Sequence, residues 1–169
     1  MKAHKISELA LLTALALIIF VVELQLPDLI PIPGVKLGLA NIITVYAVYR
    51  YSAKEVALIV SARIILAAFF ASRVMALLYS AVGAALCLTG MLLIKRIIPL
   101  KYIWLSSVVG AVLHNTGQII AAVAMLRSFA VITYYPVLVI SGCIAGTFTG
   151  ICAQILINRK LMLNEKADR

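Results

Sequence analysis

The chain has 169 residues, of which 64% are hydrophobic and only 12% are charged, and its formal net charge is +9. A soluble domain has roughly 45–50% apolar and about 25% charged residues, and so short a chain cannot bury this much apolar surface in one aqueous core. The composition therefore excludes a water-soluble domain and predicts an integral membrane protein. The basic residues flank apolar runs rather than line one polar face, which argues against a nucleic-acid partner.

Six apolar stretches follow one another along the chain. A bilayer core about 30 Å thick requires roughly 20 apolar residues in a helix. After the first stretch, the segment from Glu23 to Lys36 has three prolines in seven positions, so we expect a loop there. The prediction is an all-α bundle of six transmembrane helices forming a single transmembrane domain over residues 1–169. The helices cover about residues 6–22, 37–49, 55–70, 74–94, 102–126 and 134–157, and the polar tail from residue 158 is expected to fray.

The basic residues indicate how this bundle is oriented. Lys and Arg in short loops accumulate on the cytoplasmic side. Lys36, Arg73 and Arg127 fall on one side of the six predicted spans, and Arg63 lies within a span. The other eleven fall on the side of the N-terminus, at Lys2, Lys5, Arg50, Lys54, Lys95, Arg96, Lys101, Arg159, Lys160, Lys166 and Arg169. We therefore predict a multi-pass protein of the bacterial cell membrane with both termini in the cytoplasm.

Small residues four positions apart mark surfaces where helices approach closely in lipid. In the last helix, Gly142, Gly146 and Gly150 have this spacing, and we interpret them as packing inside the bundle. Ala10 and Ala14 have it in the first helix. Because a terminal helix often lies at the edge of a bundle, these two alanines are candidates for docking a partner protein.

Polar side chains within a span are costly unless they face the protein interior or a wet cavity. The candidate substrate-binding residues are those polar and aromatic residues in or near the outer half of the spans: Lys36, Asn41, Arg63, Arg73, Tyr79, His114, Asn115, Gln118 and Tyr135. Arginine offers a fork that fits a carboxylate or phosphate, and aromatic rings can cover an apolar part. We predict a site at the external face for a small, anionic or amphipathic ligand.

Each of these residues also has a structural interpretation. Arg63 can pair with a helix-end carbonyl or with Gln118 instead of a ligand. His114 can be an interhelical histidine, and Tyr135 can belong to the aromatic belt at the membrane interface.

The sequence lacks the motifs of catalysis. None of the six acidic residues is central in a span, and no Asp-rich cluster can hold Mg²⁺ against a diphosphate. No Walker-type phosphate loop occurs, and Cys87, Cys143 and Cys152 lie in apolar stretches without metal-ligand spacing. We expect no cofactor or metal, and no enzyme activity from this chain alone.

Two strings resemble a known family. The stretch from Pro31 to Asn41, PIPGVKLGLAN, and the stretch from Ala111 to Gln118, AVLHNTGQ, resemble bacterial proteins called heptaprenyl diphosphate synthase component I, or the Gx transporter family. The resemblance covers nearly the whole chain, from Leu9 to about Ile157. Members of that family look like the substrate-binding S components of energy-coupling factor (ECF) transporters.

This resemblance implies one function directly and leaves a second open. An S component binds its small-molecule substrate near the external face, under the loop between the first two helices. It works with a membrane coupling (T) subunit, which Ala10 and Ala14 would contact, and a pair of cytoplasmic ATPases. The alternative is an accessory membrane subunit of heptaprenyl diphosphate synthesis, associated with an Asp-rich soluble synthase.

Overall fold

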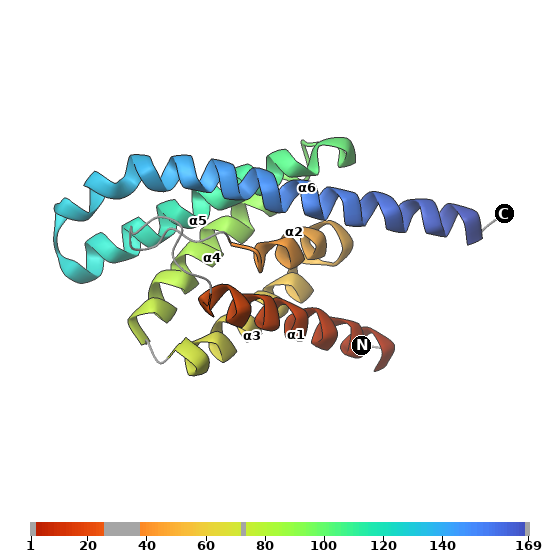
Figure 1. Ribbon diagram of the computed structural model, residues 1–169, viewed down its shortest axis with the longest axis horizontal. Coiled ribbons are helices and arrows are strands. Elements are labelled where there is room, and N and C mark those ends of the chain that lie inside the picture. The colour runs from red at the N-terminus through yellow and green to blue at the C-terminus, as the bar shows by residue number, and fades with distance from the viewer. Residues whose placement is uncertain (1–2, 26–37, 72–73, 168–169) are drawn as a thin grey trace.

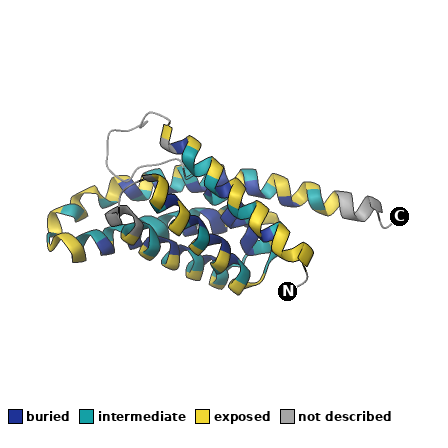
Figure 2. Cartoon of the chain, turned by 90° about the horizontal axis from the view of Figure 1, so that it is seen from below, coloured by how far each residue is buried: buried dark blue, intermediate teal, exposed yellow. Residues whose placement is uncertain are grey.

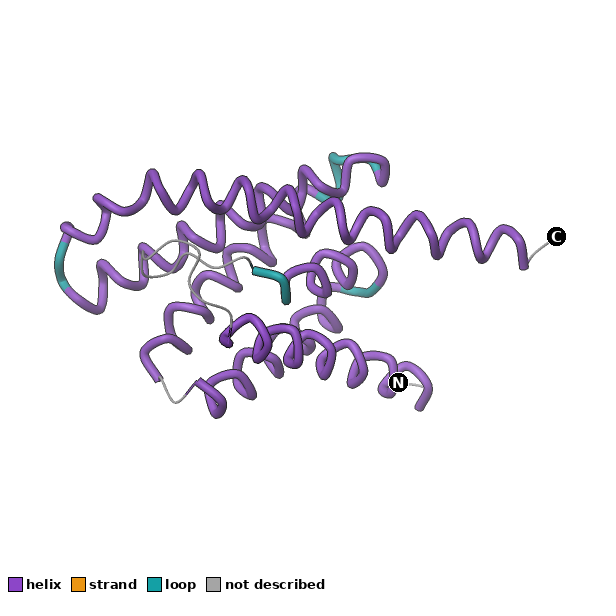
Figure 3. The backbone as a smooth tube through the Cα atoms, viewed as in Figure 1, coloured by secondary structure: helices purple, strands orange, loops and turns teal. Residues whose placement is uncertain are grey.

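The computed structural model describes residues 3–25, 38–71 and 74–167, where helices are joined by short turns and loops and no strand is present (Figures 1 and 3). The six α-helices are α1 (Ala3–Gln25), α2 (Asn41–Arg50), α3 (Ala53–Ala71), α4 (Val74–Ile94), α5 (Ile103–Leu126) and α6 (Tyr135–Ala167). Two short 3₁₀ helices, η1 (Leu100–Tyr102) and η2 (Phe129–Tyr134), precede α5 and α6. The predicted all-α class with six helices is confirmed for these residues.

Three predicted helix ends differ from the structure, one of them the start of α2, which lies at Asn41 rather than near residue 37. Helix α1 continues past residue 22, so Glu23 lies in its last turns rather than in a loop. Helix α6 continues ten residues past Ile157 instead of fraying, because its polar extension is rich in Lys, Leu, Met, Glu and Ala, which are strong helix formers. Polarity indicates where a helix leaves an apolar environment, but it does not indicate where the helix ends.

The short helix α2 lies at the centre of the bundle and contacts each of the other five α-helices. Its residues Ala47 and Val48 are fully buried. Ile59 of α3, Met91 of α4 and Ile103 of α5 belong to the same core cluster and have almost no exposed surface. Buried positions gather in the interior of the bundle, and exposed positions line its outside (Figure 2). A helix of only ten residues that is buried on most sides positions whatever polar groups it carries inside the molecule.

Helix α5 packs closely between α4 and α6 through small residues. A side chain on Gly146 would meet the backbone of Val108 at 2.7 Å, and one on Gly150 would meet that of Trp104 at 2.6 Å. On the other side of α5, Gly117 and Gly83 bring the backbones of α5 and α4 together. The interpretation of the α6 glycines as internal packing is therefore confirmed.

Helix α1 lies at the edge of the bundle and packs on α3 and α2. Lys5 forms an ion pair with Glu55 at 2.5 Å, and Tyr51 donates a hydrogen bond to Glu8 at 3.1 Å. Burial and this hydrogen bond raise the pKa of Tyr51 to about 12, so its hydroxyl remains a donor at neutral pH. Ala10 and Ala14 are both exposed on α1, as expected for residues at an edge.

The two termini lie at the same end of the molecule, as do the α2–α3 and α4–α5 connections (Figure 1). In the described part of the chain, three segments are long and apolar enough to cross a membrane: Ala3–Glu23, Leu100–Leu126 and Phe129–Met162. This length and composition are those of a membrane protein. Six spans and a cytoplasmic location for the termini stay predictions.

Candidate ligand-binding centre

A buried arginine is the centre of the polar region between the helices. The side chain of Arg63 on α3 is only 9% exposed, and its Nη1 lies 3.4 Å from Asn41 Oδ1 and 3.5 Å from Thr44 Oγ1. Both partners stand at the start of α2. These contacts are long for hydrogen bonds, so they hold the guanidinium only weakly.

A buried carboxylate accompanies this cation. Glu23 on α1 is 8% exposed, and its two oxygens accept hydrogen bonds from the backbone N–H groups of Gly38 at 2.5 Å and Leu39 at 3.1 Å. Gly38 has a positive φ of 66°, a backbone conformation that favours glycine. Glu23 therefore fastens the end of α1 to the turn that leads into α2.

Glu23 and Arg63 act on one another through space. They interact electrostatically, yet the ion pairs found among the described residues, His4–Glu8 and Lys5–Glu55, both lie elsewhere. The charge of Arg63 is thus balanced at a distance rather than by a carboxylate in direct contact. A cation held in this way can still accept a direct anionic partner.

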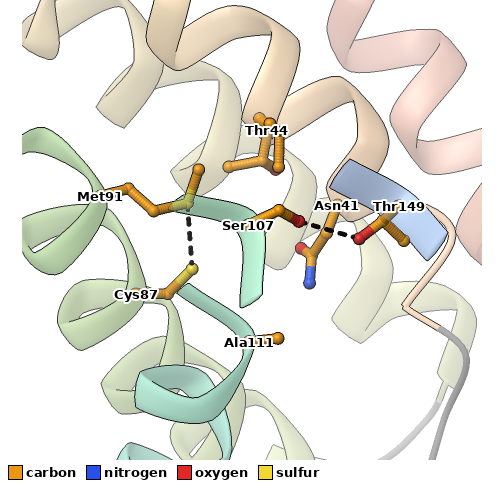
Figure 4. Close-up of a pocket in the computed structure, with 8 residues that line it drawn as sticks. Asn41, Thr44, Cys87, Met91, Ser107, Ala111 and Thr149 are labelled. Carbon is orange, nitrogen blue, oxygen red and sulfur yellow. Dashed lines mark hydrogen bonds between the residues drawn. The ribbon is translucent and has the colours of Figure 1, made fainter. Parts of the chain in front are cut away.

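A small cavity lies beside Asn41 and Thr44, at the start of α2 (Figure 4). Its volume is about 10 Å³, which is about the space that one water molecule needs. Asn41 and Thr44 line it and are also the partners of Arg63. The other lining residues are Val45, Cys87, Met91, Ser107, Ala111 and Thr149. As the structure stands, the cavity is too small for an organic ligand.

The cavity walls are fixed by their own contacts. Ser107 on α5 and Thr149 on α6 share a hydrogen bond of 3.0 Å, and the Cys87 sulfur lies 3.6 Å from that of Met91 (Figure 4). Binding of anything larger than water here requires the helices or side chains around the cavity to move apart.

His114 and Gln118 lie together at the close crossing of α4 and α5. A side chain built on Gly83 would approach the His114 carbonyl oxygen at 2.8 Å and Gln118 Cγ at 3.0 Å. Arg63 also interacts electrostatically with His114. Because they are four positions apart, these two residues share one face of α5, and that face is the one next to α4.

Asn115 and Tyr135 make contacts elsewhere. The Asn115 side-chain amide donates to the Leu138 carbonyl oxygen at 2.6 Å, and the Tyr135 hydroxyl lies 2.9 Å from Thr116 Oγ1. Both contacts join α5 to α6. The structure thus brings Asn41 and Arg63 into contact with one another, and His114 lies close enough to interact electrostatically with Arg63. Asn115 and Tyr135 instead form hydrogen bonds at the α5–α6 interface.

The remaining predicted residues add little to this centre. Tyr79 is half-buried on α4. Lys36 and Arg73 lie outside the described residues. Sequence reasoning missed Glu23, Thr44, Ser107 and Thr149. Glu23 carried a usable signal, since a carboxylate at the end of an apolar run needs a buried partner; the hydroxyl residues are too common in membrane helices to be singled out.

Comparison with known proteins gives one match. The family described as heptaprenyl diphosphate synthase component I matches residues 12–156 of the chain. No curated protein and no solved structure matches. The matched range contains both strings from which the resemblance was inferred, and it confirms that resemblance.

Proposed function

Because the chain belongs to the heptaprenyl diphosphate synthase component I family, we propose that it is an accessory membrane subunit of prenyl diphosphate synthesis. The observation that carries this proposal is the family match over residues 12–156. The description names a component of a synthase, which agrees with the prediction that the chain is not an enzyme by itself. A second, soluble component would supply the Asp-rich motifs that bind Mg²⁺ and diphosphate.

The chemistry of the product explains why such a synthase would use a membrane subunit. A long prenyl diphosphate has an apolar chain and a multiply charged head. Three apolar segments long enough to cross a membrane can keep the chain out of water, since each buried CH₂ contributes about 0.8 kcal/mol. Cations at the membrane surface can hold the head.

Two features favour the importer alternative as a second candidate. One is the buried centre of Glu23, Asn41 and Arg63, which lies at the start of α2 where an S component would bind its substrate. The other is the exposed pair Ala10 and Ala14 on the edge helix α1, where a coupling subunit would dock. In that function the ligand would be anionic, and the cavity would open to admit it.

The two functions differ in their partners, so copurification separates them. The tagged chain is solubilised gently from its native host and the proteins that accompany it are identified by mass spectrometry. Recovery of an Asp-rich soluble synthase supports the proposed function. Recovery of a membrane coupling subunit with two ATPases would overturn it and support the importer.

Substitution of the docking alanines provides a second comparison. Under the importer function, Ala10→Trp with Ala14→Trp removes the coupling subunit from the purified complex, because tryptophan prevents close helix approach. Ile18→Trp, at another exposed position of α1, is the matched control. Retention of the coupling subunit by the double variant would show that α1 does not dock it through these alanines.

A further inference from the structure

An open groove lies between α3 and α4, at the end of the bundle that carries both termini. Its volume is about 490 Å³, within the range of roughly 300–1,000 Å³ that small-molecule sites occupy. Ala53, Thr89, Leu92 and Leu93 form its walls, and Lys95 and Arg96 complete the lining. It therefore joins an apolar surface to two adjacent cations.

The two cations differ in how they are held. Arg96 is exposed. The Lys95 ammonium donates a hydrogen bond of 2.6 Å to the Val48 carbonyl oxygen, and it lies 5.8 Å from the centre of the Tyr49 ring. An ammonium has three donors, so Lys95 keeps donors for an anion while its position is fixed at the end of α2.

The surroundings of the groove add positive charge. Lys54 follows the lining residue Ala53 and is exposed, as is Arg50 at the end of α2. The nearest acidic residue along the chain, Glu55, is paired with Lys5. An anion that enters the groove therefore meets cations whose charges are not cancelled by a carboxylate of the lining.

We propose that this groove binds a prenyl diphosphate, with the diphosphate on Lys95 and Arg96 and the first isoprene units along Leu92 and Leu93. The inference rests on the proposed function and specifies where the product is held. The groove lies at the end predicted to face the cytoplasm, where a soluble synthase releases its product. The Arg63 centre lies at the opposite end of α2, beside a cavity of only about 10 Å³.

An anionic phospholipid is the competing occupant, because its phosphate would meet the same cations. It has two acyl chains, whereas a prenyl diphosphate has one. The lining has only two large apolar side chains, Leu92 and Leu93, beside the small residues Ala53 and Thr89. The single chain matches this lining better.

Binding to the purified full chain in nanodiscs of neutral phosphatidylcholine tests the proposal. Radiolabelled farnesyl diphosphate is the probe, and inorganic diphosphate and farnesol are tested as competitors. Arg96→Gln removes an exposed cation, and Thr89→Trp fills the groove from an exposed position. We expect each variant to weaken farnesyl diphosphate binding by about tenfold or more, and each competitor alone to bind far more weakly. Arg159→Gln, which removes an exposed cation from α6, should have no effect.

Three results would overturn the groove assignment. The first is that farnesyl diphosphate does not bind the unaltered chain. The second is that both groove variants bind it with the affinity of the unaltered chain. The third is that the probe is displaced when phosphatidylglycerol replaces part of the neutral lipid, which would make this a phospholipid site. Loss of binding in Arg63→Met alone would move the site to the buried centre. None of these results bears on copurification with a synthase, so the proposed function and the groove fail separately.

Discussion

At the residue scale, the buried centre contains two opposite charges that do not touch but stabilise one another. Arg63 and Glu23 are both buried and interact without direct contact. Removing either charge leaves the other less well compensated in a medium of low dielectric constant. Replacing one of the two charges should therefore lower the free energy of unfolding more than replacing the other charge does afterwards.

A double-mutant cycle measures this dependence. We expect Arg63→Met and Glu23→Gln each to lower the free energy of unfolding by about 1–3 kcal/mol, and the double variant to lower it by less than the sum. The coupling should be about 1 kcal/mol. Denaturation of the purified chain in mixed micelles provides the three values.

The cycle that combines Arg63→Met with Glu8→Gln is the matched control. Glu8 lies at the other end of α1, where it accepts a hydrogen bond from Tyr51. The loss of unfolding free energy caused by Glu8→Gln should add to the loss caused by Arg63→Met within about 0.5 kcal/mol. Additivity in the Glu23 cycle as well would show that Glu23 and Arg63 do not share one centre.

The sequence identified some residues of this centre and not others. A charge or an amide inside an apolar stretch is conspicuous, so Arg63, Asn41 and His114 could be singled out. Sequence could not reveal that Asn115 faces α6 and that Tyr135 of α6 faces α5, because the rotation of one helix relative to another depends on packing. Glu23 was missed because the prolines after it were interpreted as extending the loop back to residue 23.

At the element scale, glycine determines how closely α5 and α6 approach. A Cβ at Gly146 would lie 2.7 Å from Val108 Cα and 3.0 Å from the Ser107 carbonyl oxygen, and both are backbone atoms that cannot move aside alone. We expect Gly146→Ala to destabilise the chain by about 1–3 kcal/mol. Thermal unfolding in detergent micelles measures the loss.

Ile144→Ala is the control for this substitution. Ile144 lies on the same helix but is 69% exposed, so its truncation leaves the α5–α6 contact intact and should change the unfolding temperature little. If Gly146→Ala were as stable as Ile144→Ala, the two helices would have to be farther apart than described.

Helices were easier to predict than their ends. Apolar length and proline positions gave six helices in the right order. The short helix α2 begins at Asn41 and is surrounded by the other helices. The pattern of apolar residues within its own ten positions does not indicate this central position. Its central place follows from contacts with segments far away in the sequence.

At the scale of the whole molecule, orientation rests on the distribution of basic residues. The two termini share one end of the described structure (Figure 1), and eleven of the fifteen basic residues are predicted to lie on that side. We expect that side to be cytoplasmic.

Cysteine labelling of intact cells tests this orientation. The three native cysteines are first replaced by alanine, and single cysteines are then placed at Arg127, after α5, and at Arg159, in α6. An impermeant maleimide should label the cysteine at position 127 from outside, and that at position 159 only after the cells are opened. The reverse pattern would contradict the predicted topology and would place the groove on the external side.

If this chain takes part in prenyl diphosphate synthesis as proposed, the most direct measurement of its role is the length of the prenyl products. The gene is deleted in its host and restored from a plasmid, and the prenyl diphosphates of each strain are separated by chain length. We predict that deletion alters the product lengths and that restoration returns them. Unchanged product lengths after deletion would contradict the proposed function.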